Sequence, residues 1–156
     1  MSLIGNIFNI LKGTWNLQRT ITGKQQATAS GQGEFLEKSP HHLEYHENMT
    51  VQFPEVEHVF SAKKSYLFEL HGDAISVFFN EDEPRFFHRF QLENRMTAST
   101  LHSCLPDIYK TNYLFQAPNR FTIIHNVTGH QKQYTSETLY TRHFYFSNVL
   151  SPDVQA

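Results

Sequence analysis

The chain has 156 residues, which is enough for one domain with a sizeable core, and it carries 13 Lys and Arg residues against 15 Asp and Glu residues. The net charge of −2 gives no electrostatic reason to expect nucleic acid or a membrane surface as partner. A single cysteine, Cys104, excludes an intramolecular disulfide and favours a reducing, cytoplasmic compartment.

The first predicted element is a short helix over residues 3–11. Its apolar positions recur at helical spacing: Leu3, Ile4, Ile7, Phe8 and Leu11. The segment has neither the basic leader nor the cleavage site of a signal peptide, and no stretch of the chain has the apolar length of a membrane helix. We expect this helix to cap one end of a larger structure.

From Thr14 onward the apolar period becomes two, which is typical of strands. Strands are predicted at 14–21 and then at about 31–38, 41–52, 59–71, 73–80, 84–93, 95–104, 107–116, 120–128 and 131–145. The polar stretch Thr22–Ser30 is interpreted as a mobile loop at one rim. We expect residues 1–150 to form a single domain and residues 151–156 a disordered tail.

About ten short strands without helical spacers predict an antiparallel meander, and a lone sheet of that size curls or closes. The predicted fold is therefore all-β: a single antiparallel up-and-down β-barrel of about 8–10 strands with a short N-terminal capping helix. Closure brings the first and last strands together, so that Trp15 lies beneath Arg142 as a cation–π pair. Gly13 and Tyr140 complete this structural set.

Alternation along the strands predicts which side chains face the barrel interior. Polar residues accompany the apolar ones there: Arg19, Glu47, His88, Tyr109, Tyr113, His125, Lys132 and Tyr134. On the strand at 84–93, Phe86 and Phe90 share the inward face with His88. An interior that mixes apolar and polar side chains in this way is typical of a binding site.

The inward charges allow two arrangements, because a buried charge needs a partner or a ligand. Arg19 and Lys132 form a positive pair that could hold a ligand carboxylate or phosphate. Alternatively, Arg19 pairs with Glu47 inside the barrel. Lys63 and Lys64 are interpreted as a solvated pair on the surface.

Pro106 and Asp107 form a turn signal that would bring His102, Cys104, Asp107 and Tyr109 to one end of a hairpin. Three interpretations remain open for this group. In the first it is structural, with Cys104 as a small core residue. In the second Cys104 is a nucleophile activated by His102 and oriented through Asp107. In the third His88, His102 and His125, with or without Cys104, hold a metal ion.

Three marks in this order resemble those of the lipocalin-like (calycin) barrels: Gly13-x-Trp15, Asp107-Ile108-Tyr109 and Arg142. A closer resemblance, over nearly the whole chain, is to an uncharacterised calycin-like family, domain of unknown function 6314. Its pattern is matched by Leu11-Lys12-Gly13-Thr14-Trp15 with Arg19, Tyr45-His46-Glu47, Phe87-His88, His102-Ser103-Cys104-Leu105-Pro106-Asp107-Ile108-Tyr109, Val127-Thr128-Gly129-His130-Gln131-Lys132-Gln133-Tyr134 and Tyr140-Thr141-Arg142. The resemblance implies a lipocalin-like or fatty-acid-binding-like barrel and brings no established activity.

Three functions fit these residues. The first is a barrel that binds a small, partly apolar anion, with candidate contacts at Arg19, Glu47, His88, His102, Tyr109, Tyr113, His125, Lys132 and Tyr134. The second is a small enzyme that performs acid–base chemistry on an organic acid, with His102, Cys104, Asp107 and Glu47 as catalytic candidates. The third is a haem or metal protein that uses His88 or His125. The sequence assigns no cofactor and no metal-ligand motif, and Phe144 and Phe146 could support a homodimer.

Overall fold

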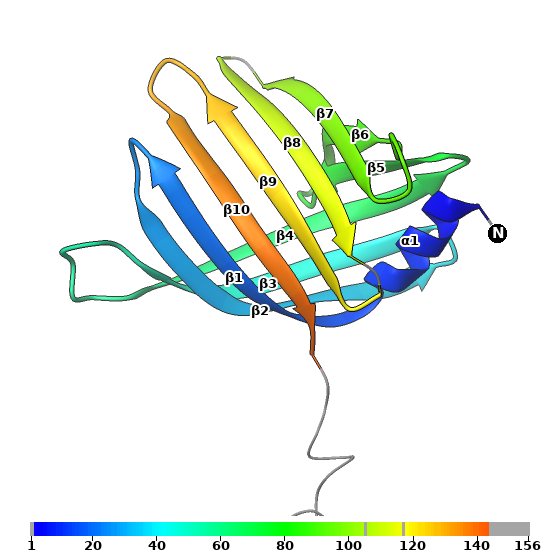
Figure 1. Cartoon of the computed structure of the whole chain (residues 1–156), viewed down its shortest axis with the longest axis horizontal. Coiled ribbons are helices and arrows are strands. Elements are labelled where there is room, and N and C mark those ends of the chain that lie inside the picture. Colours follow the sequence, from blue (N-terminus) through cyan, green and yellow to red (C-terminus); the bar gives the residue numbers. More distant parts are fainter. Residues whose placement is uncertain (1, 105, 117, 144–156) are drawn as a thin grey trace, which may run out of the picture.

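A computed structural model describes residues 2–104, 106–116 and 118–143, without the side chain of Cys104. Ten antiparallel strands form one sheet that curls into a nearly closed barrel, and one helix lies at the end of the barrel where the first strand begins (Figure 1). The predicted fold class is confirmed. Among the described residues no helix is long and apolar enough to cross a membrane.

The helix is α1 (Leu3–Leu11), with the bounds that its apolar spacing predicts. The strands are β1 (Gly13–Gly23), β2 (Ala27–Ser39), β3 (His42–Gln52), β4 (Phe60–His71), β5 (Ala74–Phe79), β6 (Arg85–Phe90), β7 (Thr97–Cys104), β8 (Asp107–Gln116), β9 (Arg120–Thr128) and β10 (Gln133–Arg142).

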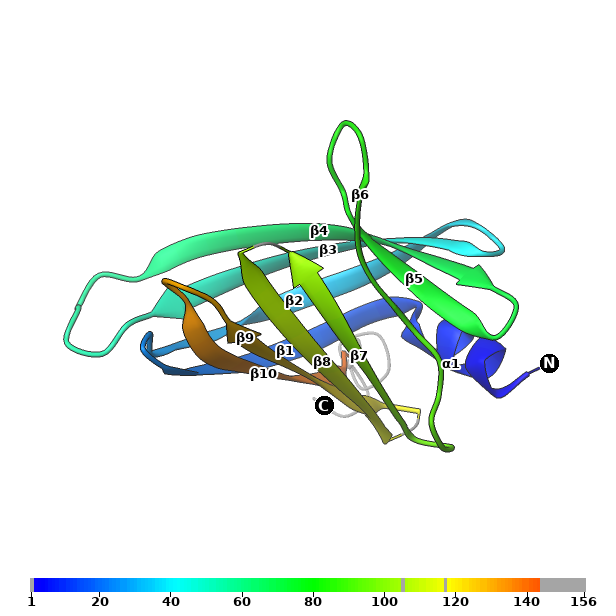
Figure 2. The same ribbon diagram turned by 90° about the horizontal axis from the view of Figure 1, so that it is seen from above.

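The strand order shows how the barrel closes. Each strand pairs with its sequence neighbour, except that β6 and β7 are the two borders of the sheet, and β1 pairs with β10. The predicted meeting of the first and last strands is therefore confirmed. β6 and β7 face each other where the barrel closes (Figure 2), but no backbone hydrogen-bond ladder joins them in the described part of the chain. Contacts between side chains connect them instead. The ring of His102 packs there against those of Phe86 and Phe87, with centroids 5.9 and 5.8 Å apart.

Helix α1 seals the end of the barrel where β1 begins. The Ser2 hydroxyl caps the helix by accepting a hydrogen bond from the Gly5 amide at 3.1 Å. The apolar face of α1 is buried in the same core cluster as Trp15, whose indole Nε1 donates to the Leu11 carbonyl at 2.8 Å. This end of the barrel is consequently filled by packed side chains.

A clamp between the chain ends completes this seal. The Arg142 guanidinium lies 3.9 Å from the centre of the Trp15 ring, which is the predicted cation–π contact, and it donates to the carbonyls of Ile10 and Lys12 at 2.6 and 2.8 Å. Gly13 has a φ of +109°, and a Cβ atom added there would lie 3.2 Å from Arg142 Nη1. Gly13 thus supplies both the backbone conformation and the room that the clamp needs.

The loop predicted at Thr22–Ser30 is much shorter in the structure, where only residues 24–26 lie between two strands. β1 runs on to Gly23 and β2 starts at Ala27. In the first part of β2 the buried residues Ala27 and Ala29 alternate with exposed Thr28 and Ser30. The strand period is present, but its inward members are too small to stand out as hydrophobic.

The inward assignment of Phe86 is also wrong. Val77 pairs with His88 and Phe78 pairs with Phe86, so Phe87 is an extra residue in β6. This bulge turns Phe86 outward, to 46% exposure, and buries Phe87 beside His88. Alternation alone fails wherever a bulge intervenes.

The last strand is shorter than predicted, because β10 covers Gln133–Arg142 within the predicted 131–145. The tail at 151–156 and the dimer candidates Phe144 and Phe146 lie outside the described residues.

Candidate functional site

The inward-facing side chains form layers along the barrel. Next to α1 lies a packed aromatic layer in which Trp15, Phe121 and Tyr140 are in ring contact. A polar layer follows, which contains Arg19, Glu47 and Thr138. Beyond it, toward the end of the barrel away from α1, lies a cavity of about 470 Å³, a volume in the range of ligand sites. Its lining comes from β1, β2, β3, β4, β5, β6, β8, β9, β10 and two turns: Arg19, Ile21, Gln25, Ala29, Met49, Val51, Ala62, Lys64, Ser65, Tyr66, Phe79, Asn80, Glu81, Phe87, Tyr109, His125, Tyr134 and Ser136.

Small residues at inward positions leave this space open. Ala29 on β2, Ala62 on β4 and Ser136 on β10 contribute little volume where the other layers carry rings. Aromatic and aliphatic side chains surround them, so the cavity wall is mainly apolar. The cavity is consequently suited to an apolar body with few polar groups.

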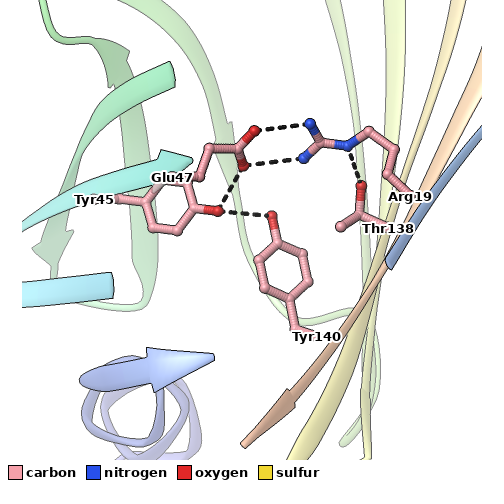
Figure 3. A network of polar contacts seen from close by, with 5 residues as sticks. All are labelled: Arg19, Tyr45, Glu47, Thr138 and Tyr140. Atoms are coloured by element: carbon pink, nitrogen blue, oxygen red, sulfur yellow. Dashed lines mark hydrogen bonds and ion pairs between the residues drawn. The ribbon is translucent and has the colours of Figure 1, made fainter. Parts of the chain in front are cut away.

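At the inner end of the cavity Arg19 is engaged by Glu47 (Figure 3). Its Nη1 and Nη2 donate to the two Glu47 carboxylate oxygens at 2.8 and 3.0 Å, and its Nε donates to the Thr138 hydroxyl at 2.7 Å. The Tyr45 hydroxyl donates to the same carboxylate at 2.6 Å and lies 3.4 Å from the Tyr140 hydroxyl. Of the two predicted arrangements, the internal ion pair of Arg19 and Glu47 is the one observed.

This network holds both charges in place. Burial opposes ionisation of Glu47, but the hydrogen bonds and charge of Arg19 outweigh it and lower the pKa of the carboxyl group. Burial likewise opposes the charge of Arg19, and the hydrogen bond and charge of Glu47 raise the pKa of its guanidinium. The opposite charges cancel, and because the side chains are only 11% and 2% exposed, the pair is a buried unit without net charge.

Close packing supports the network from β2. A Cβ atom added at Gly33 would lie 2.6 Å from the Tyr45 hydroxyl oxygen. The absence of a side chain at Gly33 therefore makes room for the Tyr45 ring, which in turn fixes its hydroxyl on Glu47.

Lys64, which the sequence analysis placed in a solvated pair with Lys63, also lines the cavity, a role that the sequence analysis missed. Glu47 pairs with Lys64 and Asn48 with Lys63 across β3 and β4, so Lys64 faces inward and Lys63 outward. Lys64 is solvent-exposed and is also part of the cavity lining. Burial, followed by the nearby charge of Arg19, lowers the pKa of its ammonium group. The alternation of Ala62, Lys64, Tyr66 and Phe68 was the sequence signal for this inward placement.

Two histidines of the barrel interior are neutral, and one of them, His125, is part of the cavity lining. His88 Nε2 is 2.6 Å from the Tyr113 hydroxyl, and His125 Nδ1 is 2.8 Å from the Thr111 hydroxyl. Burial lowers the pKa of each imidazole to about 3, helped at His88 by His125 and at His125 by Lys64. Both rings are uncharged at neutral pH and available for hydrogen bonding.

The remaining predicted contacts lie nearer the rim. Tyr109 and Tyr134 line the cavity and are hydrogen-bonded to each other. Lys132 is half exposed, its ammonium lies 3.6 Å from an Asp107 carboxylate oxygen, and it is not among the cavity lining. The structure therefore does not bring Lys132 to Arg19. His102 packs against Phe87 at the border of β7 and is likewise not part of that lining.

The predicted hairpin is formed by β7 and β8, with the four predicted positions at one end. His102 pairs with Tyr109, and Cys104 with Asp107. The nucleophile interpretation depends on the Cys104 side chain, which lies outside the described residues. Within the described ranges no group of three His, Cys, Asp or Glu side chains could hold a metal ion, and the rings of His88 and His125 are 6.4 Å apart.

A second hollow, of about 700 Å³, lies between the β1–β2 turn and residues 52–57. Its charged lining residues are Glu55 and Glu57, and no residue of the polar layer reaches it. The barrel cavity is therefore the candidate site.

Comparison with known proteins gives the chain a family. A model of a family of unknown function, DUF6314, matches residues 11–142. The chain belongs to this family. A search of curated proteins finds no match.

Solved structures with the same fold are distant in sequence. One is the S-type phycobiliprotein lyase CPES from Guillardia theta, at 11% identity and a TM-score of 0.65, with 92% of this chain and 94% of that chain covered. Another is a redesigned β-barrel, mFAP0, bound to DFHBI, at 14% identity and a TM-score of 0.50, with 85% and 99% covered. At these identities the likeness concerns the barrel fold.

Proposed function

We propose that this DUF6314 protein binds a small, partly apolar organic anion in the barrel cavity, with Lys64 as its charged contact. The observation that carries the proposal is the charge balance of the lining. Arg19 is compensated by Glu47, and Glu81 by Arg85 at 2.9 Å. Lys64 has no ion-pair partner among the described side chains, so the cavity holds one uncompensated positive charge.

An uncompensated ammonium in a mainly apolar cavity favours an anion. Lys64 is partly removed from water and lies near the charge of Arg19, which together lower the pKa of its ammonium group, and an anionic ligand would offset that effect. The rings of Tyr66, Phe79 and Phe87 offer flat apolar surface beside it. The ligand therefore combines a negative head with an aromatic or aliphatic body.

The fold neighbours support binding of a small molecule in general. The redesigned barrel carries DFHBI, and the neighbour from Guillardia theta is named as a phycobiliprotein lyase. Arg19, Glu47, His88, Tyr109, Tyr113, His125 and Tyr134 belong to the proposed binding region, whereas Lys64 takes the charged role that the sequence assigned to Lys132.

The acid–base alternative receives less support from Glu47. Its carboxylate accepts three hydrogen bonds and its pKa is lowered, whereas a general base works best with a pKa near the working pH. The geometry therefore favours binding over proton transfer at this residue.

Calorimetric titration with 2-naphthoate tests the proposal. Lys64→Met should weaken binding at least about tenfold, because it removes the positive charge and keeps the length of the side chain. Lys63→Met, on the outward face of the same strand, is the matched control and should leave the affinity unchanged. Equal affinity of the wild type and Lys64→Met would refute the proposed charged contact.

A further inference from the structure

A small inner cavity of about 30 Å³ adjoins the main one. The two share lining residues: Arg19, Lys64, Tyr66, Phe87, His125 and Ser136. The inner cavity is lined in addition by His88, Tyr113 and the Tyr45–Glu47 pair. Its volume is about that of one water molecule in the liquid, so it admits a group of only a few atoms.

One residue of this lining, His88, has a buried polar atom without a partner. His88 is 2% exposed, and its Nδ1 makes no hydrogen bond within the described chain. An unpaired polar atom in the interior is costly, and the great majority of such atoms are satisfied. Such an atom either raises the cost of folding or is met by a small group in the cavity, which is a water molecule or an atom of a ligand.

The contact between His88 and Tyr113 decides which kind of group Nδ1 presents. If Tyr113 donates its hydroxyl hydrogen to Nε2, the proton of the neutral imidazole is on Nδ1, and one donor is left unpaired. If instead Nε2–H donates to Tyr113, both the Nδ1 lone pair and the buried Tyr113 hydroxyl hydrogen lack a partner. The first arrangement leaves fewer unsatisfied groups, so His88 presents an N–H donor.

We infer that the His88 Nδ1–H group donates a hydrogen bond to an oxygen of the ligand's head group, and that the inner cavity is a subsite for a carboxylate. This inference rests on the proposed function and names the class of its anion. Lys64 lines the same small space and supplies the charge, whereas His88 supplies a directed donor. A planar carboxylate fits a space of a few atoms better than a tetrahedral phosphate does.

Other groups around the inner cavity are already engaged. Arg19, Glu47 and Tyr45 satisfy one another, and His125 is bonded to Thr111. The imidazole of His88 stays neutral at pH 7, since burial lowers its pKa to about 3. It therefore acts through its hydrogen bond and adds no second charge to the site.

The first experiment reads the tautomer of His88 directly. Nitrogen-15 NMR of histidine-labelled protein without added ligand should show His88 protonated at Nδ1, the less common tautomer of a histidine side chain in water. Tyr113→Phe should abolish that preference, because Nε2 then loses its donor. A proton on Nε2 of His88 in the wild type would overturn the inference.

The second experiment compares 2-naphthoate with 2-naphthamide, which keeps the carbonyl acceptor and lacks the charge. The double variant His88→Phe/Tyr113→Phe removes both polar partners together, which limits the damage to the fold. We expect it to weaken both probes about tenfold. His46→Gln, on the outer face of β3, is the control and should change neither affinity.

The two proposals fail in different ways. Unchanged affinity of the double variant for both probes would overturn the role of His88, even if Lys64→Met still weakened 2-naphthoate. If the wild type binds 2-naphthoate and 2-naphthamide equally well, and the double variant still binds both more weakly, the proposal of an anionic ligand is overturned. The inner cavity would then be a subsite for a neutral carbonyl group.

Discussion

The two ends of the barrel are built on opposite principles. Near α1 the interior is filled by rings and clamped by Arg142 on Trp15, and the polar groups of the clamp bond to backbone carbonyls. Toward the other end, small residues such as Ala29 and Ala62 leave a cavity with the uncompensated Lys64 on its wall. One end thus stabilises the fold, and the other keeps space and charge available for a ligand.

The largest effect is expected at the packed end. Trp15→Ala should lower the free energy of unfolding by about 4 kcal/mol, through lost burial, a cavity and the loss of the Arg142 contact. Urea denaturation followed by far-UV circular dichroism measures it, because Trp15 is the only tryptophan. Leu101→Ala, at a side chain 71% exposed, should change stability by less than about 0.5 kcal/mol. A Trp15→Ala loss as small as this control would remove the contrast between the two ends.

Glu47→Gln comes next, at the boundary between the two regions. It leaves the buried Arg19 without a counter-charge and should cost about 3 kcal/mol in the same denaturation experiment. Glu37→Gln, which breaks the exposed pair with Lys12, is the control and should cost less than about 1 kcal/mol. Similar losses in the two variants would mean that Arg19 is hydrated from the cavity.

The pH dependence of stability separates His88 from the carboxylates. Its pKa is about 3 in the folded chain and near 6.5 when unfolded, so the unfolded state binds more protons between these values and stability falls as the pH is lowered through this window. Between these two pKa values the loss of stability due to His88 approaches about 1.4 kcal/mol per pH unit, and well above pH 6.5 His88 no longer makes stability depend on pH. Denaturation at several pH values should give a shallower slope for His88→Phe/Tyr113→Phe, and an unchanged slope would contradict the buried neutral imidazole.

Filling the cavity should have the smallest effect on stability. Ala62→Phe adds a ring where the lining has room, and we expect the free energy of unfolding to change by less than about 1 kcal/mol. The same change should weaken 2-naphthoate at least about tenfold, measured by calorimetry. Ser61→Phe on the outer face of β4 is the control for binding. Retained affinity in Ala62→Phe would place the ligand elsewhere.

The packed end was the more predictable of the two. Trp15 and Arg142 lie near opposite ends of the chain, and closure of a strand meander brings them together. Helix α1 was recognisable from strong apolar spacing over 3–11. These features follow from periodicity and topology, which a sequence carries directly.

The cavity end was harder to predict, for identifiable reasons. The strand residues within Thr22–Ser30 were not recognised because the inward-facing ones are alanines. The bulge at Phe87 turns Phe86 outward, opposite to its predicted orientation. Lys64 was taken for a surface residue because it follows another lysine. This site is defined by small side chains and by a charge without a partner. Such features are hard to recognise in a sequence, because they depend on which residues the fold brings next to them.

The arrangement of β6 and β7 affects the tendency of the protein to aggregate. An edge strand usually exposes a row of unpaired amide and carbonyl groups. A strand of another protein can pair with them, which leads to aggregation. Here the two borders face each other across the rings of Phe86, Phe87 and His102, so each shields the other. The barrel wall can also part along this line without breaking a ladder between described strands, so breathing motions are expected to begin there.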